Sequence, residues 1–233
     1  MMLNFSDYPI IWGVGFVAGA VALIGFSRLI ASTTASMSTV EQGFSKVLRI
    51  FLAVWVFVAI AYALLVGLDF TSFIPTLVIP LLIGTIALFR PVPTSILRCV
   101  PLHLLTLLGT YRIAGGVFVY AHFKHDLLSY GFAFNAGWGD VLTGVLAPLV
   151  AYAVYKRVSG AYLIVLIWTF IGIGDLIVAP ISANLYGAQR LVDFPLNLIP
   201  LFLGPPFGIL LHTITLRAAW LQLRAEPAIA HVA

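Results

Sequence analysis

Residues 10–30 read IIWGVGFVAGAVALIGFSRLI, and Arg28 is the one charged side chain in this apolar run. A helix needs about 20 predominantly apolar residues to cross the hydrocarbon core of a bilayer, so the run is long enough to span it. The same character extends along the chain, whose 233 residues are 62% hydrophobic and 9% charged. Soluble globular proteins carry about 25% charged residues. The sequence therefore predicts an all-α, polytopic membrane protein.

Long apolar runs bounded by charged or turn residues predict seven transmembrane helices in a single transmembrane domain, residues 1–233. Seven spans use about 140 residues, which leaves short connections and no room for a water-soluble catalytic domain. No basic residue precedes the first run and it has no small-residue cleavage pattern, so we expect a retained helix rather than a signal peptide. The predicted helices lie near residues 10–30, 48–68, 74–90, 99–122, 137–155, 160–182 and 195–217.

The basic residues indicate how these helices are oriented. With the N-terminus outside and the C-terminus in the cytoplasm, two basic residues, Lys124 and Arg190, fall on the outer side. Nine fall on the cytoplasmic side, in agreement with the positive-inside rule. We therefore expect a multi-pass protein of the cell membrane, in bacteria the inner membrane, with the lipid bilayer as its main partner. The nine are Arg28, Lys46, Arg49, Arg90, Arg98, Lys156, Arg157, Arg217 and Arg224.

The net charge of +4 raises the question of nucleic-acid binding. Proteins that bind nucleic acids gather their basic residues on one face or stripe. Here the basic residues are dispersed at the ends of the predicted helices, so no nucleic-acid partner is expected.

Three ionisable residues, Arg112, Asp140 and Asp175, fall inside predicted spans. Each costs about 2.5–3.5 kcal/mol at the centre of an inserted helix, so such residues normally face the bundle interior and find partners. Their positions put all three in the outer half of the bilayer, and Asn197 adds a neutral polar group at that depth. We therefore expect one connected polar cluster. These four residues are the candidate ligand-binding residues.

The two aspartates share a local sequence, GWGDVLTG at 137–144 and GIGDLIVA at 172–179. Small residues beside each acid allow neighbouring helices to approach closely. Arg112 with two carboxylates has a net charge of −1, which invites a proton, a cation or a further basic group such as Arg190. Two interpretations stay open: a buried ionic lock that fixes helix packing, and a substrate, proton or cation site.

Histidines at the outer end of the fourth predicted helix suggest a metal site. On helical phase, His122 and Asp126 fall roughly on the face of Arg112. With Asp140 they form a conceivable set of ligands for a divalent metal ion. Hydrogen bonds from these residues to water or lipid headgroups are the alternative.

A second histidine pair suggests haem. His103 and His212 lie at similar depth on the fourth and seventh predicted helices, as bis-imidazole haem ligation in a bundle requires. His103 is on about the opposite helical face from Arg112, however, so both faces would have to be buried. Hydrogen-bonded packing histidines are the alternative.

Two segments depart from a simple helix pattern. The outer connection over residues 127–138 is strongly apolar and aromatic, which fits either interfacial anchoring or a lid over an outer cavity. The last predicted helix contains GPPFG at 204–208, and two consecutive prolines remove two helical donors. A kink or a short unwound stretch is therefore expected there, and interrupted helices recur at transport sites.

These features predict a small membrane transporter or permease-like protein with a small-molecule or ion substrate. One carboxylate would exchange a proton or cation, and Arg112 would hold an anionic group or bias the carboxylates. The alternatives are a membrane-embedded metal- or haem-binding enzyme or redox protein, and a structural subunit of a larger complex or homo-oligomer. The sequence has no phosphate-binding glycine loop, HExxH or GxSxG motif, and no lysine within a predicted span for a retinal Schiff base.

The predicted topology is testable by site-specific labelling in intact cells. A cysteine placed directly after Arg157 should be labelled from the cytoplasmic side, and a tag at Lys124 should be reached from outside, because nine basic residues favour one face and two the other. Labelling in the reverse sense would contradict the assigned orientation.

Overall fold

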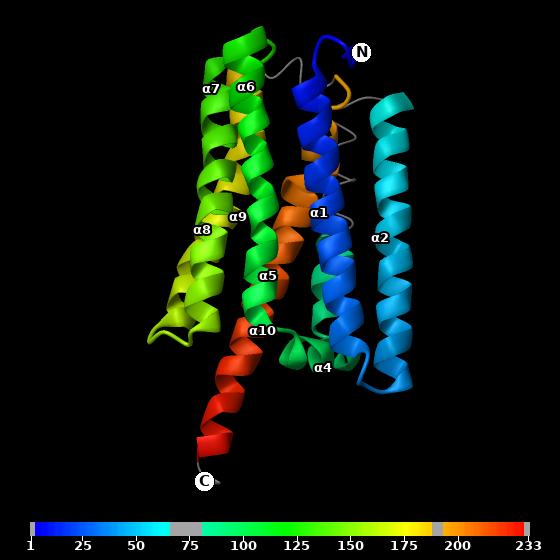
Figure 1. Cartoon of the computed structure of the whole chain (residues 1–233), viewed down its shortest axis with the longest axis vertical. Coiled ribbons are helices and arrows are strands. Elements are labelled where there is room, and N and C mark those ends of the chain that lie inside the picture. The colour runs from blue at the N-terminus through cyan, green and yellow to red at the C-terminus, as the bar shows by residue number, and fades with distance from the viewer. Residues whose placement is uncertain (1–2, 66–80, 188–192, 231–233) are drawn as a thin grey trace.

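A computed structural model describes residues 3–65, 81–187 and 193–230, and every regular element in these ranges is helical (Figure 1). A further helical stretch covers Leu81–Leu88. The named elements are α1 (Pro9–Thr34), α2 (Thr39–Leu65), α4 (Pro91–Cys99), α5 (Leu102–Leu108), the 3-10 helix η1 (Gly109–Gly115), α6 (Gly116–His125), α7 (Tyr130–Phe132), the π-helix η2 (Ala133–Gly137), α8 (Trp138–Tyr155), α9 (Ala161–Tyr186), the π-helix η4 (Ile199–Leu203) and α10 (Pro205–Ala230).

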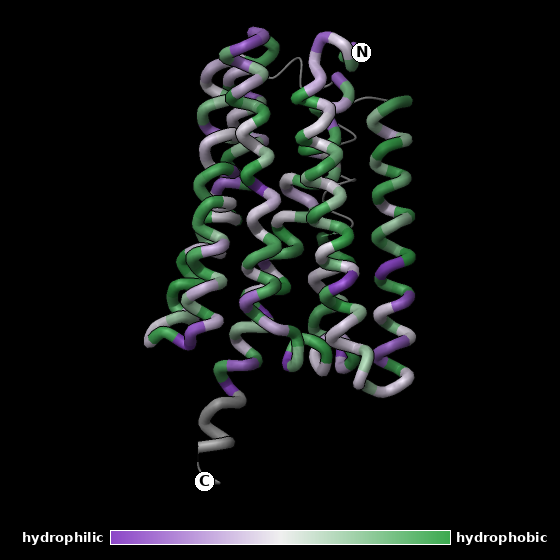
Figure 2. The backbone as a smooth tube through the Cα atoms, in the orientation of Figure 1, coloured by the Kyte–Doolittle hydropathy of each residue, from purple (hydrophilic) through white to green (hydrophobic). Residues whose placement is uncertain are grey.

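The long helices run side by side, and the two termini lie at opposite ends of the bundle (Figure 1). The continuous column of α5, η1 and α6 packs against α8, and α8 packs against α9, which in turn contacts α10. On the other side of the column stands α1, followed by α2. Hydrophobic residues dominate the middle of the long helices, whereas hydrophilic residues gather towards their ends (Figure 2). This is the distribution expected of helices that cross a bilayer.

Among the residues that the structure describes, five helical stretches are long and apolar enough to cross a membrane. A sixth arises if two shorter helices, bent by 77° at their junction, form one broken span. The predicted third helix, residues 74–90, lies partly outside the described residues. The predicted seventh, residues 195–217, corresponds to η4 and the first half of α10, which are not among the five. The five are Pro9–Thr34, Thr39–Leu65, Leu102–His125, Tyr130–Tyr155 and Ala161–Tyr186, and the broken pair is Leu81–Leu88 with Pro91–Cys99.

The first two helices are longer than predicted, since the predicted bounds of 10–30 and 48–68 leave residues 31–47 outside any span. α1 continues to Thr34 and α2 starts at Thr39, so the connection is only residues 35–38. The reason is a local start signal, because the side chain of Ser38 hydrogen-bonds to Glu41 three residues later. A serine followed at this spacing by glutamate is typical of a helix N-terminus.

A short helix that the sequence did not predict, α4, lies across the end of the bundle near the α1–α2 turn (Figure 1). Prolines at its start and two residues after its end favour a separate helix rather than an extension of its neighbours. Two contacts hold it: the Ser95 hydroxyl donates to the Glu41 carboxylate of α2 at 2.9 Å, and the Gln222 amide of α10 donates to the Val100 carbonyl at 2.9 Å. α4 therefore links α2 to α10.

The aromatic segment over residues 127–138 is not a lid, which corrects one of the two interpretations. From Tyr130 the chain is helical, running through α7 and η2 directly into α8. Tyr130, Phe134 and Trp138 recur every fourth residue and all three are exposed, so they form one outward helix face. Phe132 points the other way and its ring packs at 5.3 Å from that of Phe118. The outward aromatic face suits a membrane interface.

The last helix is interrupted where the sequence predicted a break. η4 ends at Leu203, Gly204 has a non-helical conformation (φ −73°, ψ −113°), and α10 starts at Pro205. Proline is tolerated in the first turn of a helix because the backbone N–H groups there have no intrahelical acceptor. The carbonyl of Leu203 next to the break accepts a hydrogen bond from the Tyr111 hydroxyl at 2.7 Å. Such pairing is required at membrane depth, where water does not satisfy backbone groups.

Replacing Tyr111 by phenylalanine should destabilise the protein by about 1–3 kcal/mol, the cost of leaving a buried acceptor without its donor. The ring itself packs edge-on against Phe207 at 5.5 Å and would be retained. The measurement is reversible unfolding in detergent or bicelles. Exposed Tyr152 on α8 offers a matched control, and equal, negligible effects of the two substitutions would contradict the role of this hydrogen bond.

Candidate functional site

Arg112 lies in η1, in the middle of the column formed by residues 102–125. A 3-10 stretch within a longer helix often marks a strained or functional position. The backbones of η1 and α8 approach each other closely because Gly144 of α8 has no side chain at the contact. A Cβ there would lie 2.5 Å from the Ile113 backbone nitrogen and 3.0 Å from the carbonyl carbon of Arg112. The close approach brings the Arg112 side chain within reach of α8 and of the helices behind it.

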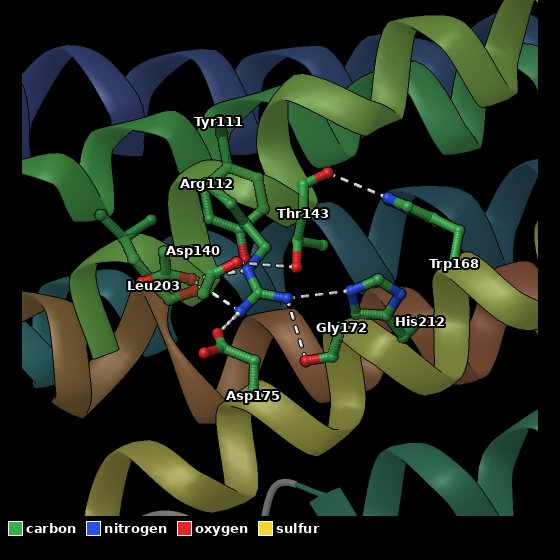
Figure 3. A network of polar contacts seen from close by, with 10 residues as sticks. Tyr111, Arg112, Asp140, Thr143, Trp168, Gly172, Asp175, Leu203 and His212 are labelled. Carbon is green, nitrogen blue, oxygen red and sulfur yellow. Dashed lines mark hydrogen bonds and ion pairs between the residues drawn. The ribbon is translucent and has the colours of Figure 1, made fainter. Parts of the chain in front are cut away.

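The guanidinium of Arg112 is the centre of a buried polar network (Figure 3). Its Nε donates to Asp140 Oδ1 at 2.7 Å, and Nη2 lies 2.6 Å from the same oxygen. Nη2 also pairs with Asp175 Oδ2. Nη1 donates to the Gly172 carbonyl at 3.0 Å and to His212 Nε2 at 3.2 Å. These contacts use all five N–H donors of the guanidinium and join η1 to α8, α9 and α10.

The carboxylates outnumber the guanidinium. The side chain of Arg112 is 2% exposed and those of Asp140 and Asp175 are each 10% exposed, so the three groups pair almost entirely away from water. With both aspartates ionised, the group carries a net charge of −1. Asp140 Oδ2 and Asp175 Oδ1 accept no hydrogen bond from the part of the chain that the structure describes. One oxygen on each carboxylate is therefore available to a proton or a cation.

Glycines provide the space that the carboxylates occupy. A Cβ on Gly139 would overlap the carboxylate of Asp175, and a Cβ on Gly115 would overlap that of Asp140. Gly174 holds the position equivalent to Gly139 in the repeated local sequence, yet it faces open space. The repeat therefore supplies an aspartate from both helices, but the glycine directly before the aspartate makes room for a partner only in α8.

His212 of α10 completes the network and contacts Arg112 on one side and Trp168 on the other. Because a guanidinium only donates, Nε2 of His212 must accept, so the ring is neutral and carries its proton on Nδ1. Nδ1 is buried and has no hydrogen-bond partner among the described residues. The indole ring of Trp168 lies 4.5 Å away, held by its own hydrogen bond to the Thr143 carbonyl at 2.9 Å. A buried donor without an acceptor is costly and rare.

The structure brings together three of the four predicted ligand-binding residues, Arg112, Asp140 and Asp175. Asn197 is fully buried, and its amide donates to the Ala63 carbonyl of α2 at 2.9 Å. This bond ties the segment before η4 to α2 rather than to α8 or α9. Arg190, the predicted additional basic group, lies outside the described residues.

The predicted metal ligands are not assembled, which is a correction. His122 Nδ1 donates to the Leu128 carbonyl at 2.7 Å, and Asp126 is exposed at the C-terminal cap of α6 with φ 49°. Asp140 is engaged by Arg112 instead. Within residues 3–65, 81–187 and 193–230, no group of three or more His, Cys, Asp or Glu side chains is placed to hold a metal ion. Helical phase alone did not reveal which neighbour each side chain faces.

The predicted haem pair also does not fit. The ring of His103 packs on Tyr155 of α8 at 5.4 Å, whereas His212 packs on Trp168. The guanidinium of Arg112 occupies the Nε2 side of His212, where an axial ligand would bind iron. The alternative interpretation of packing histidines is therefore the better description of both residues. Sequence reasoning missed His212 as a neighbour of Arg112, and the one available signal was its polarity within an apolar helix.

Residues 70–220 match a family described as a domain of unknown function (DUF8737). The chain belongs to this family. Every residue of the Arg112 network lies within the matched region, whereas α1 and α2 precede it. No curated protein and no solved structure matches the chain.

Replacing Arg112 by methionine should destabilise the protein by about 3–5 kcal/mol, because it leaves two buried carboxylates without their partner. Adding Asp140→Asn and Asp175→Asn to this variant should recover much of the loss, since the unpaired charges are then removed. Exposed Arg98 on α4 provides the control substitution, Arg98→Met. Unfolding measured in one detergent compares all four proteins, and an Arg112→Met protein as stable as the parent would exclude a buried ion pair.

Proposed function

We propose that this protein is a small multi-pass membrane transporter in which the Asp140–Arg112–Asp175 cluster exchanges a proton or a cation with the aqueous phase. The observation that carries the proposal is the excess of one carboxylate in a buried site. An unbalanced charge within a membrane bundle is expensive and typical of ion and proton pathways. The unused oxygens of Asp140 and Asp175 supply the acceptors for the exchanged ion.

Asp175 is the group that we assign to this exchange. Arg112 contacts Asp140 through two nitrogens but Asp175 through one, so protonation of Asp175 costs fewer charged contacts. Burial does not distinguish the two carboxylates, since both side chains are 10% exposed, so the number of contacts with Arg112 decides the assignment. A proton on Asp175 makes the remaining pair of Arg112 and Asp140 electrically neutral. The exchange would thus switch the cluster between a net charge of −1 and a balanced state.

Arg112 is less suited to hold an anionic substrate in this conformation. All five of its N–H donors are used by protein acceptors, so an anion would have to displace one of them. The proposal therefore assigns Arg112 to controlling the charge of the carboxylates. The break at Gly204 gives a nearby element that can rearrange, since Tyr111, the neighbour of Arg112 in η1, holds the carbonyl of Leu203.

The proposed topology has seven spans, with the N-terminus outside and the C-terminus in the cytoplasm of a bacterial inner membrane. Termini at opposite ends of the bundle support an odd number of crossings (Figure 1). In this arrangement the substrate is a small molecule or an ion, and the bilayer is the surrounding partner. The nine basic residues assigned to the cytoplasmic side support this orientation of the helices in the membrane.

A structural subunit held together by the cluster is the second candidate. It is favoured by one observation, the complete use of the Arg112 donors, because a satisfied network rigidifies the helices that it joins. The membrane-enzyme alternative has no support from the described residues, because neither of its predicted ligand sets is assembled there.

The substitution Asp175→Asn separates the two candidates, because it keeps the volume of the side chain and removes its charge. In a transporter, the variant should fold and lose the dependence of uptake on an imposed pH or cation gradient. A screen of metabolites and ions by thermal stabilisation of the purified protein first supplies the substrate. Uptake into proteoliposomes then compares the parent with Asp175→Asn.

Exposed Asp126 supplies the matched control, Asp126→Asn, because asparagine tolerates its left-handed conformation and the same charge is lost away from the cluster. The control should transport like the parent. A strongly destabilised Asp175→Asn protein whose folded fraction retains gradient-dependent uptake would overturn the transport role of Asp175 and favour the structural candidate.

A further inference from the structure

A groove between α1 and the α5–η1 column is separate from the Arg112 network. Its volume is about 960 Å³, at the upper end of the range of about 300–1,000 Å³ for sites that hold small-molecule ligands. Gly13 of α1 lines it and a Cβ there would meet no atom within 4 Å, so the missing side chain keeps the groove open. The larger apolar side chains of the two walls include Val14, Val17, Val21, Leu104, Leu107 and Ile113.

The groove is longer than one acyl chain of a phospholipid. Its α1 wall extends from Gly13 to Ser32, about 28 Å at the rise of an α-helix. The hydrocarbon core of a bilayer is about 30 Å thick, so an acyl chain from one leaflet fills roughly half of such a groove. An apolar path of this kind on the membrane-facing side of α1 fits an extended hydrocarbon chain better than a compact solute.

Four polar side chains line this groove, and two of them are already satisfied. The Ser32 hydroxyl donates to the Leu29 carbonyl at 3.0 Å, and the Tyr111 hydroxyl donates to the Leu203 carbonyl. The other two are Arg28 and Thr110. The Oγ1 atom of Thr110 is buried without a hydrogen-bond partner, and Arg28 makes no hydrogen bond or ion pair with any residue that the structure describes.

Of the two unsatisfied groups, Arg28 matches the phosphate of a phospholipid. Arg28 is exposed and lies at the end of the groove near the α1–α2 turn, where a phosphate would reside at the membrane surface. Thr110 lies further along the groove, towards the hydrocarbon, and its Oγ1 atom is buried beneath the wall of the groove. The charge of Arg28 favours a headgroup with a net negative charge over a zwitterionic one, because no described carboxylate neutralises it.

We propose that this groove binds one anionic phospholipid, with its phosphate at Arg28 and one acyl chain between α1 and the α5–η1 column. The inference needs the chain to lie in a bilayer but does not depend on transport. The lipid would touch η1 through Thr110 and Ile113, on the side away from the Arg112 network. Its occupancy would therefore support the element that positions Arg112.

Native mass spectrometry of the full-length protein in detergent tests the headgroup. With added phosphatidylglycerol, one lipid should stay bound to each chain, and binding of phosphatidylcholine should be weaker by about fivefold, the effect expected of one cation at the surface. Arg28→Gln should remove this preference. Arg98→Gln, which removes an exposed charge at the same end of the bundle but outside the groove, should leave it intact.

A second pair of variants tests the path of the acyl chain. Val17→Trp fills the groove from an exposed position and should lower retention of phosphatidylglycerol, whereas Val54→Trp on the exposed face of α2 should not. Circular dichroism checks that both variants fold. Equal binding of the two lipids, equal effects of Arg28→Gln and Arg98→Gln, or full retention by folded Val17→Trp would each overturn the proposal.

Discussion

A guanidinium held away from water must find an acceptor for each of its five N–H donors, and much of this structure is arranged around that requirement. Arg112 obtains its acceptors from three different helices, α8, α9 and α10. No single helix can supply them, because the donors fan out in a plane and the acceptors must surround it. The requirement therefore fixes how closely η1 and these helices approach. The glycines at the contacts are what make that approach sterically feasible.

η1 connects three features that are far apart in the sequence. Tyr111 reaches the interrupted last helix, Arg112 reaches the carboxylates, and Thr110 and Ile113 border the groove beside α1. A small movement of this 3-10 segment would act on all three. Close-packed contacts respond to such movement by switching between discrete arrangements rather than by deforming smoothly. This coupling gives the proposed proton or cation exchange a physical route to the break at Gly204.

The balance of charge also separates stability from function. Buried ion pairs are weak contributors to stability, because desolvation offsets the attraction between the charges. A lock made only for packing needs one carboxylate for one guanidinium, and this cluster has two. The neutral His212 adds a buried Nδ1–H with no described acceptor. Both features cost free energy in this conformation, and both are reasonable if the proposed transporter alternates between this conformation and another.

Local sequence rules succeeded where one residue type or one period decides the outcome. Runs of apolar residues located the five described helices that are long enough to cross a membrane, and the proline pair located the break before α10. In the segment after Tyr130 the aromatic residues recur at helical spacing, which indicates a helix. The prediction of a loop relied on their aromatic composition instead and was wrong. α4 was missed because a span-length window averages over so short a helix.

The amino-acid pattern was enough to predict an all-helical chain with several apolar helices, and to predict that Arg112, Asp140 and Asp175 share a buried site. Both follow from the cost of placing polar groups in hydrocarbon, which depends on residue type and depth alone. The packing of the helices was needed to show that His212 and the Gly172 carbonyl complete the network and that Asn197 bonds to α2. It also decided that the predicted metal and haem ligands face other partners. The physical reason is that the partner of a side chain depends on how neighbouring helices are rotated and how far apart they lie. Packing sets both, and the spacing of residues along one helix does not reveal them.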